Sequence, residues 1–419
     1  MLELVNRRAN LFEKMKENSV AIIFGGVAKT SSEDEFLPFV VNRNFYYLTN
    51  IEQEDSILVL VKSFAEKRAY LFVQEYSELK EKWTGKRLTN DQANQISSIQ
   101  NVYSLNNFDN ILNLILDKNV AQYGNINNIY LDFTKEQKIG EGKYIEDFKQ
   151  ELLDKYGEHN VEDIYPLIRD LRMIKSSYEV ENIVKAINVT NSAIMNSVRS
   201  MHVGMKEYEL SDSFEYYGKT NGRHGLAFPS IVANGKNATC LHYPTQTDTL
   251  KDGDLVQFDV GLRNEMYCAD ISRVYPVNGR FNELQKAIYT AVLNCNKAVI
   301  RYAKPGLTIK DLQDYTIEFL KAECIRLKLM PKDDDIRKYY YHNISHHLGL
   351  DTHDISLREK PLEPGNVITV EPGLYFANYG IGIRIEDDVL IREGSNEVLS
   401  SGVRKEIEDI EQICRSRGY

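Results

Sequence analysis

The chain has 419 residues and a formal net charge of −10, with 51 Lys+Arg against 61 Asp+Glu. The length predicts two or three domains, and 42% apolar residues with 10% aromatics exclude wholesale disorder. The acid excess argues against a general nucleic-acid-binding protein, which needs a basic face, and no apolar run approaches the length of a membrane span.

Residues 1–18 have the pattern of a charged amphipathic helix, without the apolar stretch of a secretory signal. The five cysteines have no C-x-x-C spacing, which is typical of reduced thiols in a cytosolic enzyme. Both features predict a cytoplasmic location.

The first part of the chain is predicted to be an α/β domain, residues 1–168. Short runs rich in β-formers predict strands at residues 20–24, 44–48, 56–61 and 69–73. Helical patterns follow around residues 77–82 and 145–156. No glycine-rich phosphate loop follows these strands, so little favours a nucleotide site.

A second domain, residues 169–419, is predicted from a change of pattern near residue 175. Ser176 and Glu179 have the spacing of a capping box, which marks the start of a long helix with one apolar face. This boundary separates the α/β domain from a region with a different internal organisation.

The second domain contains a repeat. The helical segment 186–193 resembles 291–298, and a Gly-apolar pair and a second helix follow each. The strand segment 253–261 resembles 365–373, with an acid six residues after the first glycine in both. We therefore predict an α+β domain with an internal pseudo-two-fold duplication.

The repeated strands carry acidic residues. A hairpin that turns at Asn264 and Glu265 would place Asp259 directly opposite Asp270 on one face of the sheet. Two carboxylates so placed in a buried strand repel each other, which favours a cation between them.

The second copy supplies Glu371 and Glu386, and Arg384 shares a face with Glu386 by the period of a strand. A histidine-rich segment between the copies, residues 341–354, brings nitrogen ligands. Four carboxylates and an imidazole suit two divalent ions better than one zinc ion. Such a pair can activate water and polarise a carbonyl.

Each of these residues also has an ordinary structural interpretation. A strand Asp beside Gly is commonly a turn residue or an ion-pair member, an acidic run such as residues 386–388 is commonly solvated, and clustered histidines commonly form structural networks. Their matching positions in both copies favour a metal site.

Motifs along the whole chain resemble the pita-bread metallopeptidases, most closely the Xaa-Pro aminopeptidases (aminopeptidase P), with prolidase as a near relative. Those in the first domain, which resembles the creatinase/prolidase N-terminal type, are residues 43–50 and 83–88. Those in the second are residues 171–176, 241–243, 259–270, 345–354, 370–375 and 382–386. One departure is Ser177, where the family commonly has proline.

The resemblance implies two divalent ions, most often Mn²⁺, although Co²⁺, Zn²⁺ or Fe²⁺ fit the same ligands. The implied ligands are Asp259, Asp270, His346, Glu371 and Glu386, with Asp270 and Glu386 bridging. Glu371 is also expected to shuttle a proton.

Further residues are assigned roles by the same resemblance. His242 and His353 are expected to act in catalysis by positioning substrate and stabilising the tetrahedral intermediate. His342 and Arg384 are expected to flank the substrate, whereas a structural role is expected for His347. Trp83 matches a position that reaches a neighbouring subunit's active site in bacterial relatives, and a surface or core anchor is an equal alternative. A homodimer or homotetramer is expected.

The implied reaction is metal-dependent hydrolysis of the N-terminal Xaa-Pro bond of peptides with proline in second position. One alternative is a prolidase restricted to Xaa-Pro dipeptides. An alternative of another class is a non-catalytic peptide-binding protein of the same fold, although such proteins typically lose ligands that are all present here.

Overall fold

The computed structural model describes residues 2–33, 35–117, 123–134, 138–139, 143–157, 159–222 and 224–416. The chain divides into two compact units, Met1–Arg172 and Met173–Tyr419. No helix within the described ranges is both long and apolar enough to cross a membrane.

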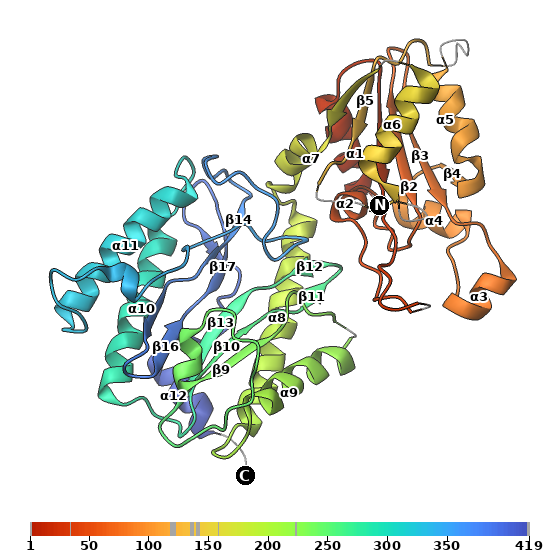
Figure 1. Cartoon of the computed structure of the whole chain (residues 1–419). Coiled ribbons are helices and arrows are strands. Elements are labelled where there is room, and N and C mark those ends of the chain that lie inside the picture. Colours follow the sequence, from red (N-terminus) through yellow and green to blue (C-terminus); the bar gives the residue numbers. More distant parts are fainter. Residues whose placement is uncertain are drawn as a thin grey trace. The chain divides into compact units, whose positions relative to one another are not determined.

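The first unit is built on a mixed six-stranded sheet (Figure 1). In spatial order its strands are β4 (Asn101–Ser104), β3 (Lys67–Val73), β2 (Ile57–Lys62), β1 (Ser19–Phe24), β5 (Asn128–Leu131) and β8 (Asn160–Asp163). Every residue of β1 and β2 is buried, so both faces of the centre of the sheet are covered. This explains why these strands are continuous apolar runs rather than alternating ones.

Helices cover this sheet. Alternate residues of β1, such as Val20 and Ile22, join one apolar core with Phe108 and Leu112 of a helix. The helices of the unit are α1 (Leu2–Lys14), α2 (Arg43–Thr49), α3 (Glu78–Thr84), α4 (Asn90–Ser97), α5 (Phe108–Leu116), α6 (Ile145–Tyr156) and α7 (Tyr165–Arg172). A small hairpin of β6 (Lys138–Ile139) and β7 (Lys143–Tyr144) completes it.

The prediction of a strand at residues 44–48 is wrong, because these residues lie in helix α2. The Asn42 side chain accepts hydrogen bonds from the backbone N–H groups of Asn44 and Phe45, and Asn50 ends the helix in the left-handed conformation. Two asparagine caps thus outweigh the β preference of the aromatic residues between them.

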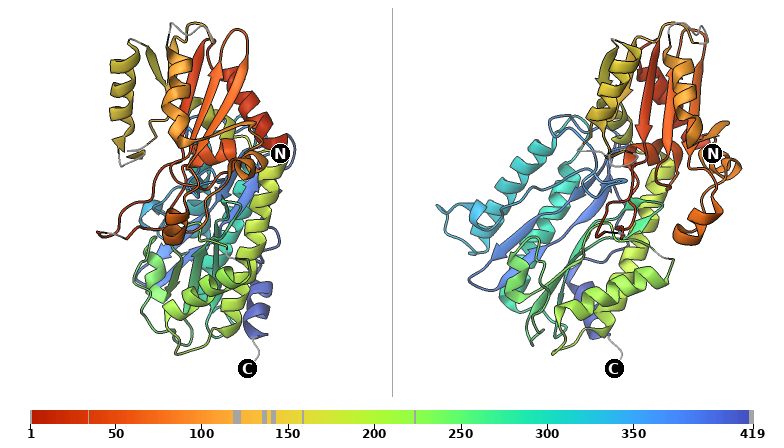
Figure 2. Two further views of the ribbon diagram at one scale, coloured as in Figure 1. Left: turned by 90° about the vertical axis from the view of Figure 1, so that its right-hand side faces the viewer. Right: turned by 45° about the vertical axis from the view of Figure 1, so that its right-hand side comes forward.

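The second unit confirms the predicted duplication. Helices α8 (Ser177–Ser200) and α9 (Glu207–Thr220) pack together in one copy, and α10 (Glu283–Tyr302) and α11 (Ile309–Arg326) do so in the other. Each pair precedes a set of antiparallel strands, which lies between the two helix pairs (Figures 1 and 2). The capping box that starts α8 is present, since Ser176 and Glu179 each accept a backbone hydrogen bond from the other.

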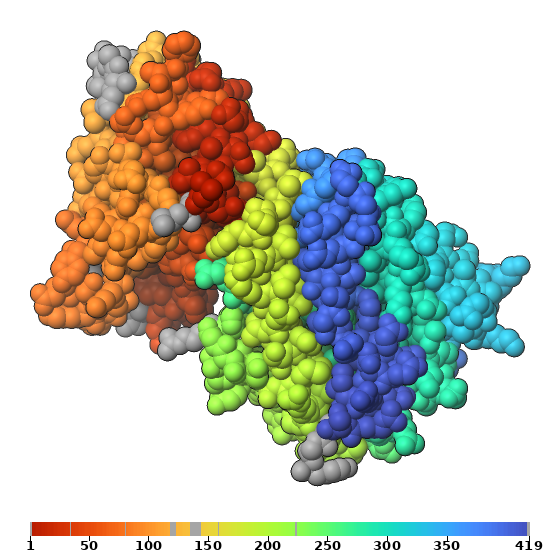
Figure 3. All heavy atoms as spheres, turned by 180° about the vertical axis from the view of Figure 1, so that it is seen from behind, coloured from red at the N-terminus to blue at the C-terminus, as the bar shows by residue number. Residues whose placement is uncertain are grey.

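The first copy contains β9 (Ile231–Asn234), β10 (Leu255–Val260), β11 (Arg263–Asn264), β12 (Tyr267–Cys268) and β13 (Ile271–Pro276). The second contains β14 (Val367–Val370), β15 (Gly373–Phe376), β16 (Ile381–Arg384), β17 (Asp387–Leu390) and β18 (Glu397–Val398). Helix α12 (Ile407–Arg415) follows and contacts both α8 and α10 on the outer face of this unit (Figure 3).

The predicted register of the first hairpin is wrong by two residues. Glu265 and Met266 both have positive φ and form the turn, so Asp259 pairs with Ser272 and not with Asp270. Moving a two-residue turn by one position moves every pair across the hairpin by two.

Both hairpins are interrupted at the residues that matter for the site. The return strand of the first copy breaks at Asp270, between β12 and β13, and that of the second breaks at Glu386, between β16 and β17. At the first break two backbone segments come so close that only glycine fits at residue 261. A Cβ on Gly261 would lie 2.0 Å from the Ala269 carbonyl oxygen. Asp270 and Glu386 therefore lie outside the regular strand pairing.

Candidate metal centre

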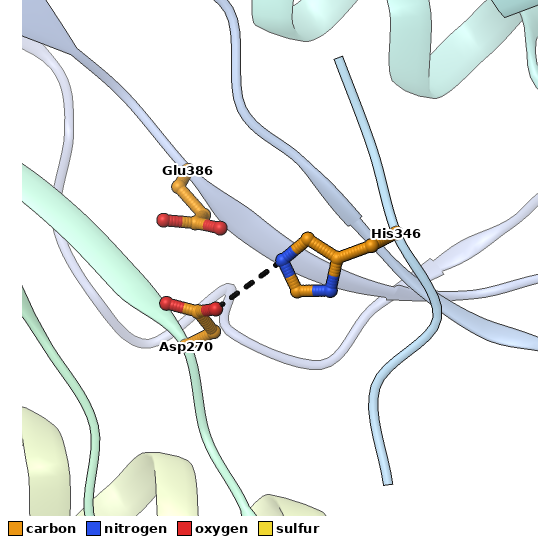
Figure 4. A group of neighbouring side chains, drawn as sticks. All are labelled: Asp270, His346 and Glu386. Carbon is orange, nitrogen blue, oxygen red and sulfur yellow. Dashed lines mark ion pairs between the residues drawn. The ribbon is translucent and has the colours of Figure 1, made fainter. Parts of the chain in front are cut away.

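Three predicted ligands form the centre of the site. One ligand atom from each of Asp270, His346 and Glu386 lies within 4.8 Å of the other two. Figure 4 shows the two carboxylates and the imidazole directed at one another, with His346 Nε2 3.4 Å from Asp270 Oδ2. Residues from both copies and from the segment between them therefore meet at one point.

The His346 ring is oriented by its own backbone neighbour. Its Nδ1 donates to the His347 carbonyl at 3.0 Å, which leaves Nε2 as the nitrogen that faces the carboxylates. The backbone N–H of His346 donates to Thr369 Oγ1 at 3.1 Å. The first bond directs Nε2 toward the place where a metal ion would bind, and the second holds the backbone of His346 in position.

Glu371 lies beside this ring. Its Oε1 is 3.5 Å from His346 Nε2 and accepts a hydrogen bond from Thr369 Oγ1 at 3.2 Å. Its Oε2 is 3.7 Å from His342 Nδ1. Its backbone N–H donates to the Ile344 carbonyl, which joins the end of β14 to the histidine-rich segment.

Asp259 is held at the side of the cluster. Its Oδ2 accepts a hydrogen bond from Arg384, and its Oδ1 lies 3.1 Å from Ser272 Oγ. Ser272 Oγ also lies 2.8 Å from Glu386 Oε2 and accepts from Arg384 Nε at 2.9 Å. Ser272 thus links a carboxylate of each copy.

Arg384 is almost fully enclosed by protein. Besides Asp259 and Ser272, its guanidinium donates to Tyr375 OH at 2.9 Å, and only 4% of the residue is exposed. Tyr375 OH donates in turn to His342 Nε2 at 2.8 Å, because His342 Nδ1 donates to the Asn343 carbonyl. A continuous chain of hydrogen bonds therefore runs from Asp259 to His342.

Three further predicted histidines are His353, His242 and His347. The His353 ring packs edge-on against His346, with centroids 4.4 Å apart, and is exposed, as is His242. Burial lowers the pKa of His353, and the neighbouring His346 and His242 lower it further. His347 is buried, neither of its ring nitrogens has a hydrogen-bond partner among the described residues, and burial lowers its pKa to about 3.

Trp83 belongs to the first unit. It lies on α3 and is 83% exposed, so its indole is not part of the core of that unit.

Burial and mutual repulsion shift the acids of the cluster. Burial raises the pKa of Glu371 to about 7, and the neighbouring Asp270 and Asp259 contribute in the same direction. Burial and the other carboxylates also raise the pKa of Asp270 and raise that of Glu386 well above its ordinary value. Burial opposes the charged His346 ring, but Asp270 and Glu371 outweigh it and raise its pKa to about 9.

This donor set fits divalent cations. Carboxylate oxygens and one correctly oriented imidazole nitrogen are concentrated in a buried space, where a positive ion would relieve their repulsion. Asp270, His346 and Glu386 could hold one such ion directly, with Glu371 next to them.

Sequence reasoning missed the residues that support the ligands. Ser272 and Thr369 orient carboxylates and His346, and Tyr375 connects Arg384 to His342. Asp388 accepts a hydrogen bond from the backbone N–H of Asp270 at 3.2 Å. The period of two could have indicated Ser272 and Thr369, because each lies two residues from an acid of its own strand segment.

The residues of the acidic run 386–388 are not solvated, since all three are buried. Asp387 pairs with Arg273 at 2.8 Å, and Arg273 also donates to the backbone carbonyl of Glu386. The Glu386 N–H donates to the Ser272 carbonyl at 3.2 Å. The two copies are thus joined by buried polar contacts at the metal cluster.

Known families match both parts of the chain. Metallopeptidase family M24 matches residues 181–393, and the N-terminal domain of aminopeptidase P matches residues 4–123. The Xaa-Pro aminopeptidase of Haemophilus influenzae is 32% identical, over 98% of this chain and 96% of its own length. That of Escherichia coli is also 32% identical, over 98% and 97% of the two chains.

Solved structures agree with these sequence relatives. An aminopeptidase P structure from Bacillus anthracis has a TM-score of 0.94 and 37% identity, covering 100% of this chain and 99% of that one. Escherichia coli aminopeptidase P with the inhibitor Pro-Leu has a TM-score of 0.89 and 29% identity, covering 99% and 98%. The predicted fold, an α/β N-terminal domain and a duplicated pita-bread domain, is confirmed. The chain therefore belongs to metallopeptidase family M24, in the group of the Xaa-Pro aminopeptidases.

Proposed function

We propose that this protein is a metal-dependent exopeptidase that hydrolyses the bond between an N-terminal residue and a following proline. The observation that carries the proposal is the buried cluster of Asp270, His346 and Glu386 inside a fold shared along its whole length with Xaa-Pro aminopeptidases. The Escherichia coli relative binds Pro-Leu as an inhibitor, and a peptide that starts with proline is what this cleavage would release.

Five residues are proposed as ligands of two divalent ions: Asp259, Asp270, His346, Glu371 and Glu386. Supporting this, Glu371 Oε1 lies 3.5 Å from His346 Nε2, and Ser272 connects Asp259 with Glu386. Mn²⁺ is the proposed metal; a zinc-substituted structure of the Escherichia coli relative is known.

When bound, divalent ions at such a site would lower the pKa of water and polarise the scissile carbonyl. Glu371 is proposed to accept the proton of the attacking water and to deliver it to the proline nitrogen. The proline nitrogen leaves as an amine and must gain a proton to do so, so its departure depends on a positioned acid. Glu371 Oε1 lies 3.5 Å from His346 Nε2, so its carboxylate stands beside the proposed metal ligands, where the attacking water would be held.

The residues around the cluster are proposed to position the substrate. His242 and His353 are assigned to the scissile region, whereas His342 and Arg384 act at its border. For Arg384 this role is indirect, because its guanidinium already donates hydrogen bonds to Asp259, Ser272 and Tyr375.

We propose that residues 1–168 form the N-terminal α/β domain and that residues 169–419 form the metallopeptidase domain. A homodimer or homotetramer in which Trp83 contributes to a neighbouring subunit's site is also proposed, and the high exposure of Trp83 is compatible with it. A cytoplasmic location stays a prediction of the sequence.

The direct test is turnover of Xaa-Pro, Xaa-Pro-Xaa and Met-Ala peptides after EDTA treatment and after return of Mn²⁺. We expect cleavage of Xaa-Pro-Xaa that EDTA abolishes and Mn²⁺ restores. Cleavage of Xaa-Pro dipeptides alone would identify a prolidase instead. The non-catalytic peptide-binding alternative would be supported by two results together. The protein would retain no divalent metal after dialysis against a buffer that contains the metal, and it would cleave none of the three peptides.

A further inference from the structure

The segment that carries His242, residues 234–248, is held at both ends by hydrogen bonds to one buried carboxylate, that of Glu207. Glu207, the first residue of α9, is 0% exposed and accepts a hydrogen bond from the Asn234 N–H at 2.7 Å. The same carboxylate accepts from Asn237 Nδ2, from Tyr243 OH and from the Asp248 N–H, each at 3.0 Å. Both ends of the segment 234–248 are therefore tied to the same group.

The segment 234–248 also packs against strand β16 of the second copy. The 3-10 helix η2 (Gly235–Thr239) lies directly on β16, where a Cβ on Gly382 would be 2.1 Å from the Ala238 carbonyl oxygen. No side chain can intervene there. The tip that follows, residues 240–242, contains exposed Cys240 and exposed His242.

One side chain from the histidine-rich segment between the two copies reaches the start of this tip. Tyr341 OH donates a hydrogen bond to the Thr239 carbonyl. The Tyr341 ring packs against Tyr375 with centroids 5.0 Å apart, and Tyr375 is the residue that donates to His342. Tyr341 thus connects the backbone just before the His242 tip with the residues that orient His342.

Tyr341 is not a core residue. It is 43% exposed, whereas the neighbouring Tyr340 is 0% exposed and donates to Gln313. The hydroxyl of this half-exposed tyrosine bonds to a backbone carbonyl and not to a group in the core of the domain. Its contact is better explained by what it holds in place.

We propose that Tyr341 is a positioning residue that holds the tip 240–242 in place through Thr239, and so places His242 for the reaction. The proposal rests on the proposed function for the role of His242. The placement itself is independent of catalysis, because a loosened tip changes the surroundings of Cys240 whether or not the protein is a peptidase.

The test compares Tyr341→Phe, which keeps the ring and removes the hydroxyl, with the wild type. Cys240 is the only exposed cysteine among the five, all of which lie in described residues, so its alkylation by iodoacetamide reports on the tip. We expect alkylation of Cys240, mapped by mass spectrometry, to be faster by about fivefold, the equivalent of one hydrogen bond. We expect kcat for an Xaa-Pro-Xaa peptide to fall by a similar factor with an unchanged melting temperature.

Two further variants separate positioning from a general structural effect. Tyr216→Phe removes the hydroxyl of an exposed tyrosine on α9 and is expected to change neither rate. In a His242→Ala background, Tyr341→Phe is expected to leave the residual kcat unchanged, because its effect passes through His242.

The proposal is wrong if Tyr341→Phe leaves the alkylation rate of Cys240 at the wild-type value, or if it lowers kcat equally with and without His242. A wild-type protein that is inactive on every Xaa-Pro peptide, yet shows faster alkylation in Tyr341→Phe, would refute the proposed function while retaining the role of Tyr341 in placing the tip.

Discussion

At the scale of single residues, two adjacent aspartates of β17 occupy opposite electrostatic environments. Burial would raise the pKa of Asp387, but Arg273 and Lys405 outweigh it and hold the pKa well below its ordinary value. Burial and the nearby Asp270 raise the pKa of Asp388 well above its ordinary value. In the metal-free protein the surroundings of Asp387 therefore favour its charged form, whereas those of Asp388 favour its neutral form.

This difference predicts opposite outcomes for the same substitution. Asp387→Asn leaves Arg273 buried beside a neutral amide and should lower the free energy of unfolding by about 3–5 kcal/mol. Asp388→Asn replaces a neutral acid by a neutral group and should cost about 1 kcal/mol or less. Urea denaturation of the metal-free variants measures both, and equal losses would contradict the assigned charges.

Ser272 gives a second prediction at this scale. Removing its hydroxyl with Ser272→Ala takes away the group between Asp259 and Glu386, so metal affinity should fall by about tenfold or more. Ser192→Ala, on the exposed face of α8, is the matched control and should bind metal as the wild type does. Competition with a fluorescent chelator measures the affinity. Unchanged affinity in Ser272→Ala would show that the hydroxyl does not orient the ligands.

At the scale of elements, the turn of the first hairpin determines which residues face each other. Glu265 and Met266 have φ of 47° and 67°, a conformation that favours Asn and Gly and disfavours long side chains. The observed turn lies one residue after the predicted one, and no Asn-Gly or Asp-Gly pair marks its position in the sequence.

A turn that is strained by its residue type can be improved. Glu265→Asn should raise the free energy of unfolding by about 0.5–1 kcal/mol, because asparagine tolerates positive φ. Glu265→Thr, β-branched at the same position, should destabilise by a similar amount. Thermal unfolding of the two variants provides the comparison, and a shift of the same sign in both would contradict the turn geometry.

Much of the fold follows from local sequence patterns, and the exceptions have identifiable physical causes. The strand at residues 255–260, the helix at 145–156 and the Ser176 capping box are confirmed because each is set by its own residues. Helix α2 was missed because the Asn42 cap outweighs the aromatic β preference.

In the candidate site, too, some features could be predicted from the sequence and others could not. His346, Asp270 and Glu386 were predicted as neighbours, and their ligand atoms lie within 4.8 Å of one another. The partners that orient them, Ser272 and Thr369, come from strands whose register no local pattern specified. Long-range register, rather than residue type, is what the sequence left open.

At the scale of the whole molecule, the duplicated domain brings carboxylates from two strand sets together in a buried space. The pKa values of Glu371 and His346, about 7 and about 9, lie above their ordinary values in the metal-free protein. Such groups stabilise the fold at low pH, and this contribution is lost as pH rises through their folded pKa values. A metal ion that binds the deprotonated ligands takes over that role at higher pH.

The rise in melting temperature caused by Mn²⁺ should therefore be larger at pH 8 than at pH 6. Protons occupy the ligands below the raised pKa values and must leave before the metal binds. Thermal melting of the EDTA-treated protein with and without Mn²⁺ at the two pH values tests this. An equal shift at both, or a larger shift at pH 6, would contradict proton–metal competition at the cluster.

The central claim is that Glu371, beside His346 and inside a divalent metal site, moves the proton in Xaa-Pro cleavage. The most direct measurement is kcat for an Xaa-Pro-Xaa peptide in the wild type and in Glu371→Gln, with the metal content of both determined. We expect kcat to fall by at least about 100-fold at equal metal content. Near-wild-type turnover in metal-loaded Glu371→Gln would contradict the claim.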